Sequence, residues 1–207
     1  MVATFWRAAA IAALALLAGF LLSLVLRPSP TAPAPELPGF YLSKTDPAAP
    51  DLSFLDQDGQ PRTFADYRGR VLVVFFGFVR CPDVCPTRLF ELAQVVKGLG
   101  PARDRVQVLL ATLDPERDVP EVLKGYVAAF DPGFGGLTGT PDQMATLAQR
   151  FYVAWRKAPL GADYTIDHSA ATYLVDATGR RVYVAGSDTT DKQLFAALGV
   201  LASQEIP

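Results

Sequence analysis

Residues 71–99 of this chain read VLVVFFGFVRCPDVCPTRLFELAQVVKGL. Residues 71–78 are mainly apolar and rich in β-branched and aromatic side chains, a pattern that is typical of a strand buried on both faces. From residue 87 to residue 99 the apolar side chains recur at helical spacing, which predicts a helix. The stretch therefore predicts a buried strand and a helix that are joined by a short loop with two cysteines.

The sequence on either side continues the alternation of strands and helices. Further predicted elements are a hairpin of residues 52–56 and 62–64 around Asp58-Gly59, a strand at 106–113, helices at 120–130, 141–151 and about 190–203, and a late hairpin of 171–175 and 181–184. This order predicts an α/β, thioredoxin-like fold with an N-terminal β-hairpin extension. The segment between residues 130 and 141 is interpreted as an addition to that plan.

The N-terminal region has a different composition. Residues 8–26 are an unbroken apolar run of 19 residues, which as a helix would span about 28 Å, close to the bilayer core of roughly 30 Å. We expect residues 1–27 to form one transmembrane helix that serves as an anchor, with its N-terminus in the cytoplasm because Arg7 precedes the run. The alternative is a cleaved signal segment, and both interpretations export the rest of the chain.

Residues 28–39 are rich in proline, which predicts a semi-rigid extended tether. Residues 40–207 are long enough for one domain with an adequate core, placed in the periplasm or an equivalent exported compartment. The net charge is −2 and basic residues do not cluster, which argues against nucleic acid as a partner. We expect a monomer that contacts the membrane through its N-terminal helix.

The chain has only two cysteines, Cys81 and Cys85, with three residues between them. A disulfide between them would close a very small loop and would remove little entropy from the unfolded chain, so a purely structural bridge is disfavoured. A thioredoxin-type redox pair has two intervening residues, and the wider spacing suits two sulfurs that converge on one ion. Cys85 lies where a helix begins, and a helix N-terminus is expected to favour its thiolate.

The only histidine, His168, precedes the predicted strand at 171–175. In a thioredoxin-like sheet, the loop that enters this strand faces the N-terminus of the cysteine-bearing helix. Two sulfurs and one imidazole favour copper or zinc, and three ligands suit copper better than structural zinc, which usually has four. The alternative is that His168 is an ordinary surface or hydrogen-bonded residue.

Four stretches together resemble the Sco/SenC family: residues 76–87 (FGFVRCPDVCPT), 113–120 (LDPERDVP), 136–139 (GLTG) and 167–170 (DHSA). The resemblance implies that residues 40–207 form a copper-binding domain, with Cu(I) or Cu(II) bound by Cys81, Cys85 and His168. It also implies a supporting, non-ligating role for Asp114. The implied function is that of a metallochaperone, and not of an enzyme with a turnover substrate.

Such a protein would deliver copper to the binuclear copper site of cytochrome c oxidase, or reduce the cysteines of that site. Its implied partner is the copper-bearing oxidase subunit or another copper chaperone. The alternative function is an exported thiol–disulfide oxidoreductase, with Cys81 and Cys85 as its redox disulfide. One departure from the family pattern is Val79-Arg80 before the first cysteine, which adds a cation next to Cys81.

Overall fold

The computed structural model describes residues 16–17, 40–42, 48–49 and 51–204 of the 207-residue chain. The chain divides into two units, residues 1–34 and 35–207, and the strands and helices discussed below belong to the second. Apart from Leu16 and Leu17, which are helical, the predicted anchor and tether lie outside the described residues. Among the residues that are described, no helix is long and apolar enough to span a bilayer.

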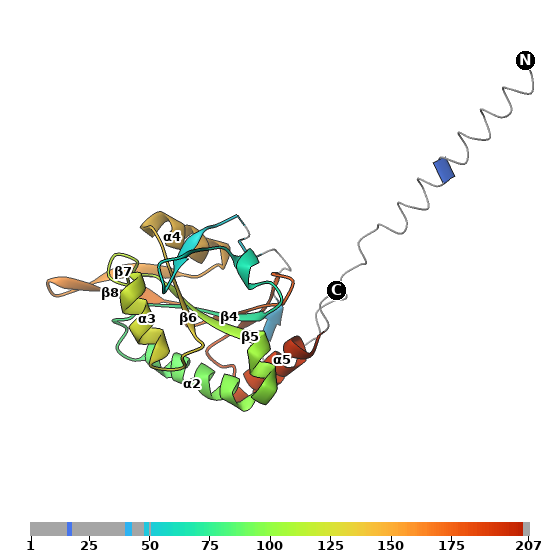
Figure 1. Ribbon diagram of the computed structural model, residues 1–207. Helices are drawn as coiled ribbons and strands as arrows, with labels where there is room; N and C mark the ends of the chain where they lie inside the picture. Colours follow the sequence, from blue (N-terminus) through green and yellow to red (C-terminus); the bar gives the residue numbers. More distant parts are fainter. Residues whose placement is uncertain (1–15, 18–39, 43–47, 50, 205–207) are drawn as a thin grey trace, which may run out of the picture. The chain divides into compact units, whose positions relative to one another are not determined.

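The core of the domain is an eight-stranded sheet with the order β1-β10-β9-β4-β5-β6-β2-β3 (Figure 1). The neighbours β4, β5 and β6 run parallel, and the other pairs are antiparallel. The strands are β1 (Phe40–Leu42), β2 (Phe54–Asp56), β3 (Pro61–Arg62), β4 (Val71–Gly77), β5 (Val106–Thr112), β6 (Gly135–Thr138), β9 (Thr172–Val175) and β10 (Arg181–Ala185).

In residues 51–204, which the structure describes without a gap, four α-helices and two 3-10 helices accompany the sheet. They are η1 (Phe64–Tyr67), α2 (Val84–Gly98), η2 (Gly100–Arg105), α3 (Pro120–Ala128), α4 (Pro141–Arg150) and α5 (Asp191–Ser203). Figure 1 shows α2 and α5 side by side below the sheet and α4 above it. Thr140 is the N-cap of α4: its side chain accepts a hydrogen bond from the Gln143 backbone at 3.2 Å, and the Gln143 side chain accepts one from the Thr140 backbone at 2.8 Å. This capping box fixes the start of α4.

The predicted thioredoxin-like arrangement is confirmed. All seven residues of β4 are buried, as expected of a strand covered on both faces. Phe76 of β4 contacts Phe151 and Tyr173, with ring centroids 5.3 Å and 5.7 Å apart. The first hairpin also forms, and its strand β2 pairs with β6, so the predicted extension widens the main sheet.

The interpretation of residues 130–141 as an addition was wrong in one respect. Residues 135–138 form β6, which lies between β5 and β2 inside the sheet. Its two glycines hide the usual strand pattern, yet both are needed. A Cβ on Gly135 would lie 2.8 Å from Leu109, and one on Gly136 would lie 3.0 Å from Leu123. Only glycine allows the neighbouring strand and helix to approach this closely.

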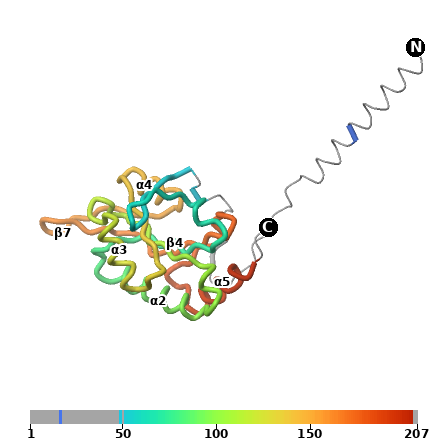
Figure 2. The backbone as a smooth tube through the Cα atoms, viewed as in Figure 1, coloured from blue at the N-terminus to red at the C-terminus, as the bar shows by residue number. Residues whose placement is uncertain are grey.

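The sequence also gave no indication of a second, two-stranded sheet. Strands β7 (Trp155–Leu160) and β8 (Asp163–His168) form an antiparallel hairpin whose turn contains Gly161 at a φ of 61°. Figure 2 shows this hairpin reaching beyond the rest of the domain. Among its residues only Ile166 is buried, so the alternation that marks a half-buried strand is missing.

Candidate metal centre

The two cysteines lie where β4 ends and α2 begins. We call residues 78–85 the cysteine loop. Its backbone turns sharply, since the N–H of Cys81 donates to the carbonyl of Phe78 at 3.2 Å. The N–H of Cys85, in the first turn of α2, donates to Sγ of Cys81 at 3.4 Å. Cys81 is partly exposed and Cys85 is fully buried, and both thiols are free.

The absence of a side chain at Gly77 makes room for the buried sulfur. A Cβ at this position would lie only 2.7 Å from Sγ of Cys85 and 3.1 Å from the ring of Phe75. The thiol of Cys85 therefore packs directly against the backbone of β4. Its position is set by the most deeply buried strand of the domain.

His168 is the last residue of β8 and pairs with Trp155 of β7. Its Nε2 lies 3.5 Å from Sγ of Cys85, and its Nδ1 lies 3.0 Å from the carbonyl oxygen of Ser169. A carbonyl accepts hydrogen bonds only, so Nδ1 carries the proton and the lone pair of Nε2 faces the sulfur. The rings of Phe75 and Phe78 meet the imidazole edge-on, at centroid distances of 6.2 Å and 6.0 Å, and restrict its orientation.

The structure thus brings Cys81, Cys85 and His168 together. Their two sulfurs and one nitrogen all lie within 4.8 Å of one another, and in the part of the chain that the structure describes this is the one group of three or more potential metal ligands. A metal about 2.3 Å from each donor holds two donors in line at most roughly 4.6 Å apart, and three donors in a plane about 4 Å apart. Two donors therefore almost reach one ion, and a three-ligand site forms after a contraction of less than about 1 Å.

The expectation that the helix N-terminus favours the Cys85 thiolate was wrong for the metal-free protein. Burial raises the pKa of the Cys85 thiol well above its ordinary value, and its hydrogen bond with Cys81 raises it further. Because a metal binds the thiolate, binding at this sulfur must release a proton.

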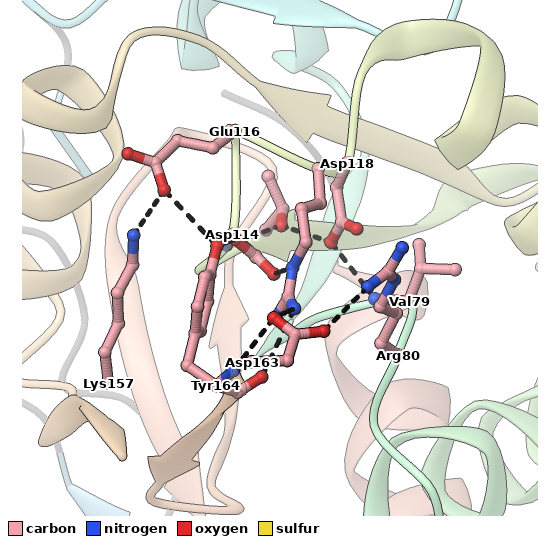
Figure 3. A network of polar contacts seen from close by, with 10 residues as sticks. Val79, Arg80, Asp114, Glu116, Asp118, Lys157, Asp163 and Tyr164 are labelled. Carbon is pink, nitrogen blue, oxygen red and sulfur yellow. Dashed lines mark hydrogen bonds and ion pairs between the residues drawn. The ribbon is translucent and has the colours of Figure 1, made fainter. Parts of the chain in front are cut away.

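Asp114, the predicted supporting residue, lies outside the group of three ligands. Its carboxylate is fully buried; it accepts a hydrogen bond from the Tyr164 hydroxyl at 2.7 Å and forms an ion pair with Arg117 (Figure 3). Tyr164 belongs to β8, the strand that ends in His168. Asp114 therefore connects the loop after β5 to the strand that carries the imidazole.

Sequence reasoning did not single out Asp118, although it lies in one of the stretches that carried the resemblance. One carboxylate oxygen of Asp118 accepts both the N–H of Val79 at 3.0 Å and the hydroxyl of Thr112 at 2.6 Å (Figure 3). Burial raises the pKa of this carboxyl, and the two hydrogen bonds offset that effect only in part. Asp118 fixes the start of the cysteine loop.

Arg80, the cation next to Cys81 in the sequence, forms an ion pair with Asp163. Its guanidinium donates to one carboxylate oxygen of Asp163 at 3.1 Å, and Arg117 donates to the other oxygen at 3.1 Å (Figure 3). Asp163 is the first residue of β8. These contacts join residues 83 and 46 positions apart in the chain, so no local sequence pattern could have indicated them.

Comparisons with known proteins point to a single family. The profile of the SCO1/SenC family matches residues 42–203. The chain is 38% identical to "Protein SCO2 homolog, mitochondrial" of Mus musculus over 152 residues, which are 72% of this chain and 60% of that protein. With a bovine relative of the same name it shares 41% identity over 133 residues, half of that protein's length. The chain thus spans about half to three fifths of the length of these two relatives.

Solved structures match at the level of the whole fold. The structure of Bradyrhizobium japonicum ScoI with copper bound has a TM-score of 0.69 and 36% identity, and the match covers 77% of this chain and 99% of that one. Yeast Sco1 with copper bound has a TM-score of 0.69 and 31% identity, with 80% of this chain and 91% of that one covered. Both of those proteins were solved with copper.

Proposed function

The chain belongs to the SCO1/SenC family, and on this premise we propose that it is a copper metallochaperone for the assembly of cytochrome c oxidase. It delivers copper to the binuclear copper site of the oxidase, or reduces the cysteines of that site. The observation that carries the proposal is the gathering of Cys81, Cys85 and His168 within 4.8 Å. It is a binding and transfer protein and not an enzyme with a turnover substrate.

The donor set supports copper as the cargo. Thiolate sulfur selects soft ions such as Cu(I), and imidazole suits Cu(II). In this proposal Cys81 and Cys85 suffice for Cu(I), while Cu(II) also requires Nε2 of His168. The lone pair on Nε2 faces the sulfur of Cys85, because the proton is on Nδ1. A histidine that binds a metal through Nε2 must be in this tautomer. Asp114 supports the site without acting as a ligand.

The predicted anchor belongs to the same proposal. Residues 1–27 hold the protein in the membrane, residues 28–39 act as a tether, and residues 40–207 form the copper-binding domain in the periplasm or an equivalent compartment. The apolar run of 19 residues and the prolines after it support this arrangement. A tether confines the domain near a membrane-bound recipient, and so raises its effective concentration there.

A second function is favoured by the state of the cysteines. Both are free, and the N–H of Cys85 lies 3.4 Å from the sulfur of Cys81, so the two residues adjoin. As a thiol–disulfide oxidoreductase, the protein would transfer two electrons and two protons from these thiols to a disulfide of the recipient. A disulfide would then form between Cys81 and Cys85.

The experiment that separates the two functions uses the full chain in detergent and the copper-bearing domain of the oxidase. The chain is loaded with Cu(I) and mixed with a reduced, metal-free recipient; we expect one copper per chain and its transfer to the recipient. In the second arm, the metal-free chain is mixed with a recipient whose site is oxidised. Reduction without any copper transfer, retained in His168→Ala, would establish the oxidoreductase instead. A chain that binds neither Cu(I) nor Cu(II) would contradict the metallochaperone proposal.

A further inference from the structure

The hairpin that carries His168 lacks the support that the cysteines have. Within the residues that the structure describes, its strands β7 and β8 pair only with each other and not with the main sheet. A two-stranded hairpin on its own is marginally stable in water. Something other than backbone pairing must therefore hold it against the cysteine loop.

Polar contacts at the far end of the hairpin supply this support. Asp163 closes the turn of the hairpin, opposite Leu160, and lies five residues from His168. Its carboxylate bridges Arg80 of the cysteine loop and Arg117 of the loop after β5 (Figure 3). The guanidinium of Arg117 also stacks over the ring of Tyr164, 3.8 Å from its centroid. One carboxylate thus ties together the three segments that build the site.

We propose that Asp163 is a positioning residue, which pins the far end of the hairpin to Arg80 and Arg117 and so keeps the imidazole of His168 beside the thiols. Without Asp163 the hairpin keeps the contacts of Tyr164 and Lys157 with the loop after β5, but it loses its tie to the cysteine loop.

The cysteine loop keeps its own support, the hydrogen bond of Val79 with Asp118 and the burial of Cys85. Loss of the two Asp163 ion pairs should therefore displace the imidazole and not the thiols, so that Asp163 governs Cu(II) binding and not Cu(I) binding. This last step rests on the proposed function.

The exposure of these groups sets the size of the effect. The side chains of Arg80 and Asp163 are 61% and 56% exposed, whereas that of Arg117 is 15% exposed. Exposed ion pairs contribute modestly and are screened by salt. We call the two ion pairs of Asp163, with Arg80 and with Arg117, the pin. If the pin is lost, a smaller fraction of molecules holds the hairpin against the cysteine loop, and the apparent Cu(II) affinity falls by the same factor.

The test measures Cu(II) and Cu(I) affinity of the full chain in Asp163→Asn and Asp163→Lys. We expect about two- to fivefold weaker Cu(II) binding in the first variant and about tenfold weaker binding in the second, where the new charge repels both arginines. Cu(I) affinity should stay within about twofold of the wild-type value in both. The double variant Asp163→Lys/Arg80→Glu should recover part of the lost Cu(II) affinity.

Arg80→Gln separates the pin from a simple charge effect. Removal of a cation near the site should strengthen Cu(II) binding if only the net charge matters, but should weaken it if the pin matters. Arg80→Lys keeps the charge and should behave like the wild type. The matched control is Asp51→Asn, which breaks the exposed pair of Asp51 with Arg150 at 3.0 Å, a pair outside the three segments that build the site. This control should not change either affinity.

A metal-free measurement keeps this inference separate from the proposed function. In Asp163→Asn, backbone amide hydrogens of residues 155–168 should exchange faster than in the wild type, with the other segments unchanged. Raising the salt concentration should speed this exchange in the wild type, because it screens the ion pairs, and should have little effect in the variant. Unchanged exchange in both Asp163 variants, or tighter Cu(II) binding by Arg80→Gln, would overturn the proposal. If the wild type bound no copper at all, the exchange data would still decide whether the pin exists.

Discussion

The two halves of the candidate site are built in different ways. Cys85 belongs to a segment that begins on β4, where every residue is buried, and its sulfur packs against the backbone at Gly77. His168 ends a hairpin with one buried residue, whose contacts with the rest of the domain include hydrogen bonds, ion pairs and a stacked arginine. Burial fixes the first half. The second half is held by polar contacts, with the rings of Phe75 and Phe78 against the imidazole.

Because of this difference, a change in salt concentration or a substitution can disturb one half of the site and leave the other half intact. Apolar burial is insensitive to salt, and its loss destabilises the whole domain. Polar contacts on a projecting hairpin are weaker and are lost locally. We therefore expect perturbations of the cysteine half to affect both oxidation states of copper, and perturbations of the histidine half to affect Cu(II) alone.

The largest effect is expected from the loss of a thiol. Cys81→Ser or Cys85→Ser should weaken Cu(I) and Cu(II) binding by at least about a hundredfold, since even the loss of an outer-sphere partner of a metal ligand costs 10–100-fold. Competition titrations with chelators of known affinity measure both values. If a variant lost the binding of only Cu(I) or only Cu(II), the contrast between the two halves of the site would be wrong, because both ions would then not share the thiols.

The removal of the imidazole tests the other half. His168→Ala should lower Cu(II) affinity at least about tenfold, while Cu(I) affinity should remain within about threefold of the wild-type value. The absorption of the Cu(II) complex should change as well, because one nitrogen donor is lost. An unchanged Cu(II) spectrum and affinity would remove His168 from the site.

A change in the supporting strand should act on the cysteine half alone. In Gly77→Ala the new Cβ would lie 2.7 Å from Sγ of Cys85, so the thiol must rotate or the strand must shift. We expect a loss of about 1–3 kcal/mol in the free energy of unfolding, with weaker binding of both oxidation states.

The matched control for that variant is Gly125→Ala in α3. No atom lies within 4 Å of a Cβ built at Gly125, and alanine favours a helix by up to about 1 kcal/mol over glycine. Chemical denaturation should therefore show an equal or slightly higher stability. Equal losses in the two glycine variants would show that the packing at Gly77 has no special role.

The smallest effect concerns pH and Asp118. The pKa of its carboxyl is raised above 3.8 in the folded protein, so the folded state binds this proton more tightly than the unfolded chain does. The contribution of Asp118 to stability is therefore fully present below about pH 3.8 and is lost as the pH rises through the folded pKa. Asp118→Asn removes this dependence. The amide oxygen can still accept from Val79 and Thr112, which now share one carboxylate oxygen.

Relative to the wild type, the Asn variant should thus be more stable at pH 7 than at pH 4, by less than the loss expected for Gly77→Ala. Urea denaturation at the two pH values measures this difference. The opposite order would mean that the ionised carboxylate stabilises the cysteine loop.

Most of the fold could be predicted because burial leaves a pattern in the sequence. The strand at 71–78 and the helices at 120–130 and 141–151 were predicted from their apolar patterns, and the predicted ends lie within a few residues of the observed ones. Strand β6 was missed because glycines replace the apolar side chains where a helix and a strand come close. The hairpin was missed because it has almost no buried face.

The residues of the candidate site also fall into those that could be predicted from the sequence and those that could not. Cys81, Cys85 and His168 could be found because these residue types are so rare in the chain. Asp118 and Asp163 could not be found, since they are two of 21 acidic residues, and their partners are brought near only by the tertiary fold. Rarity marks the groups that bind, and it gives no information about the common charged groups that hold them in place.

The unequal burial of the two cysteines imposes an order of events. Cys85 is completely covered, whereas part of Cys81 faces solvent. In the oxidoreductase alternative, a disulfide of an incoming protein would therefore meet the sulfur of Cys81 first. Attack by that thiolate would form a mixed disulfide and release one thiol of the recipient, and Cys85 would act only afterwards. The same asymmetry makes Cys81 the residue to trap: a Cys85→Ser variant would leave a single accessible sulfur, on which a mixed disulfide with the recipient could be captured and its partner identified.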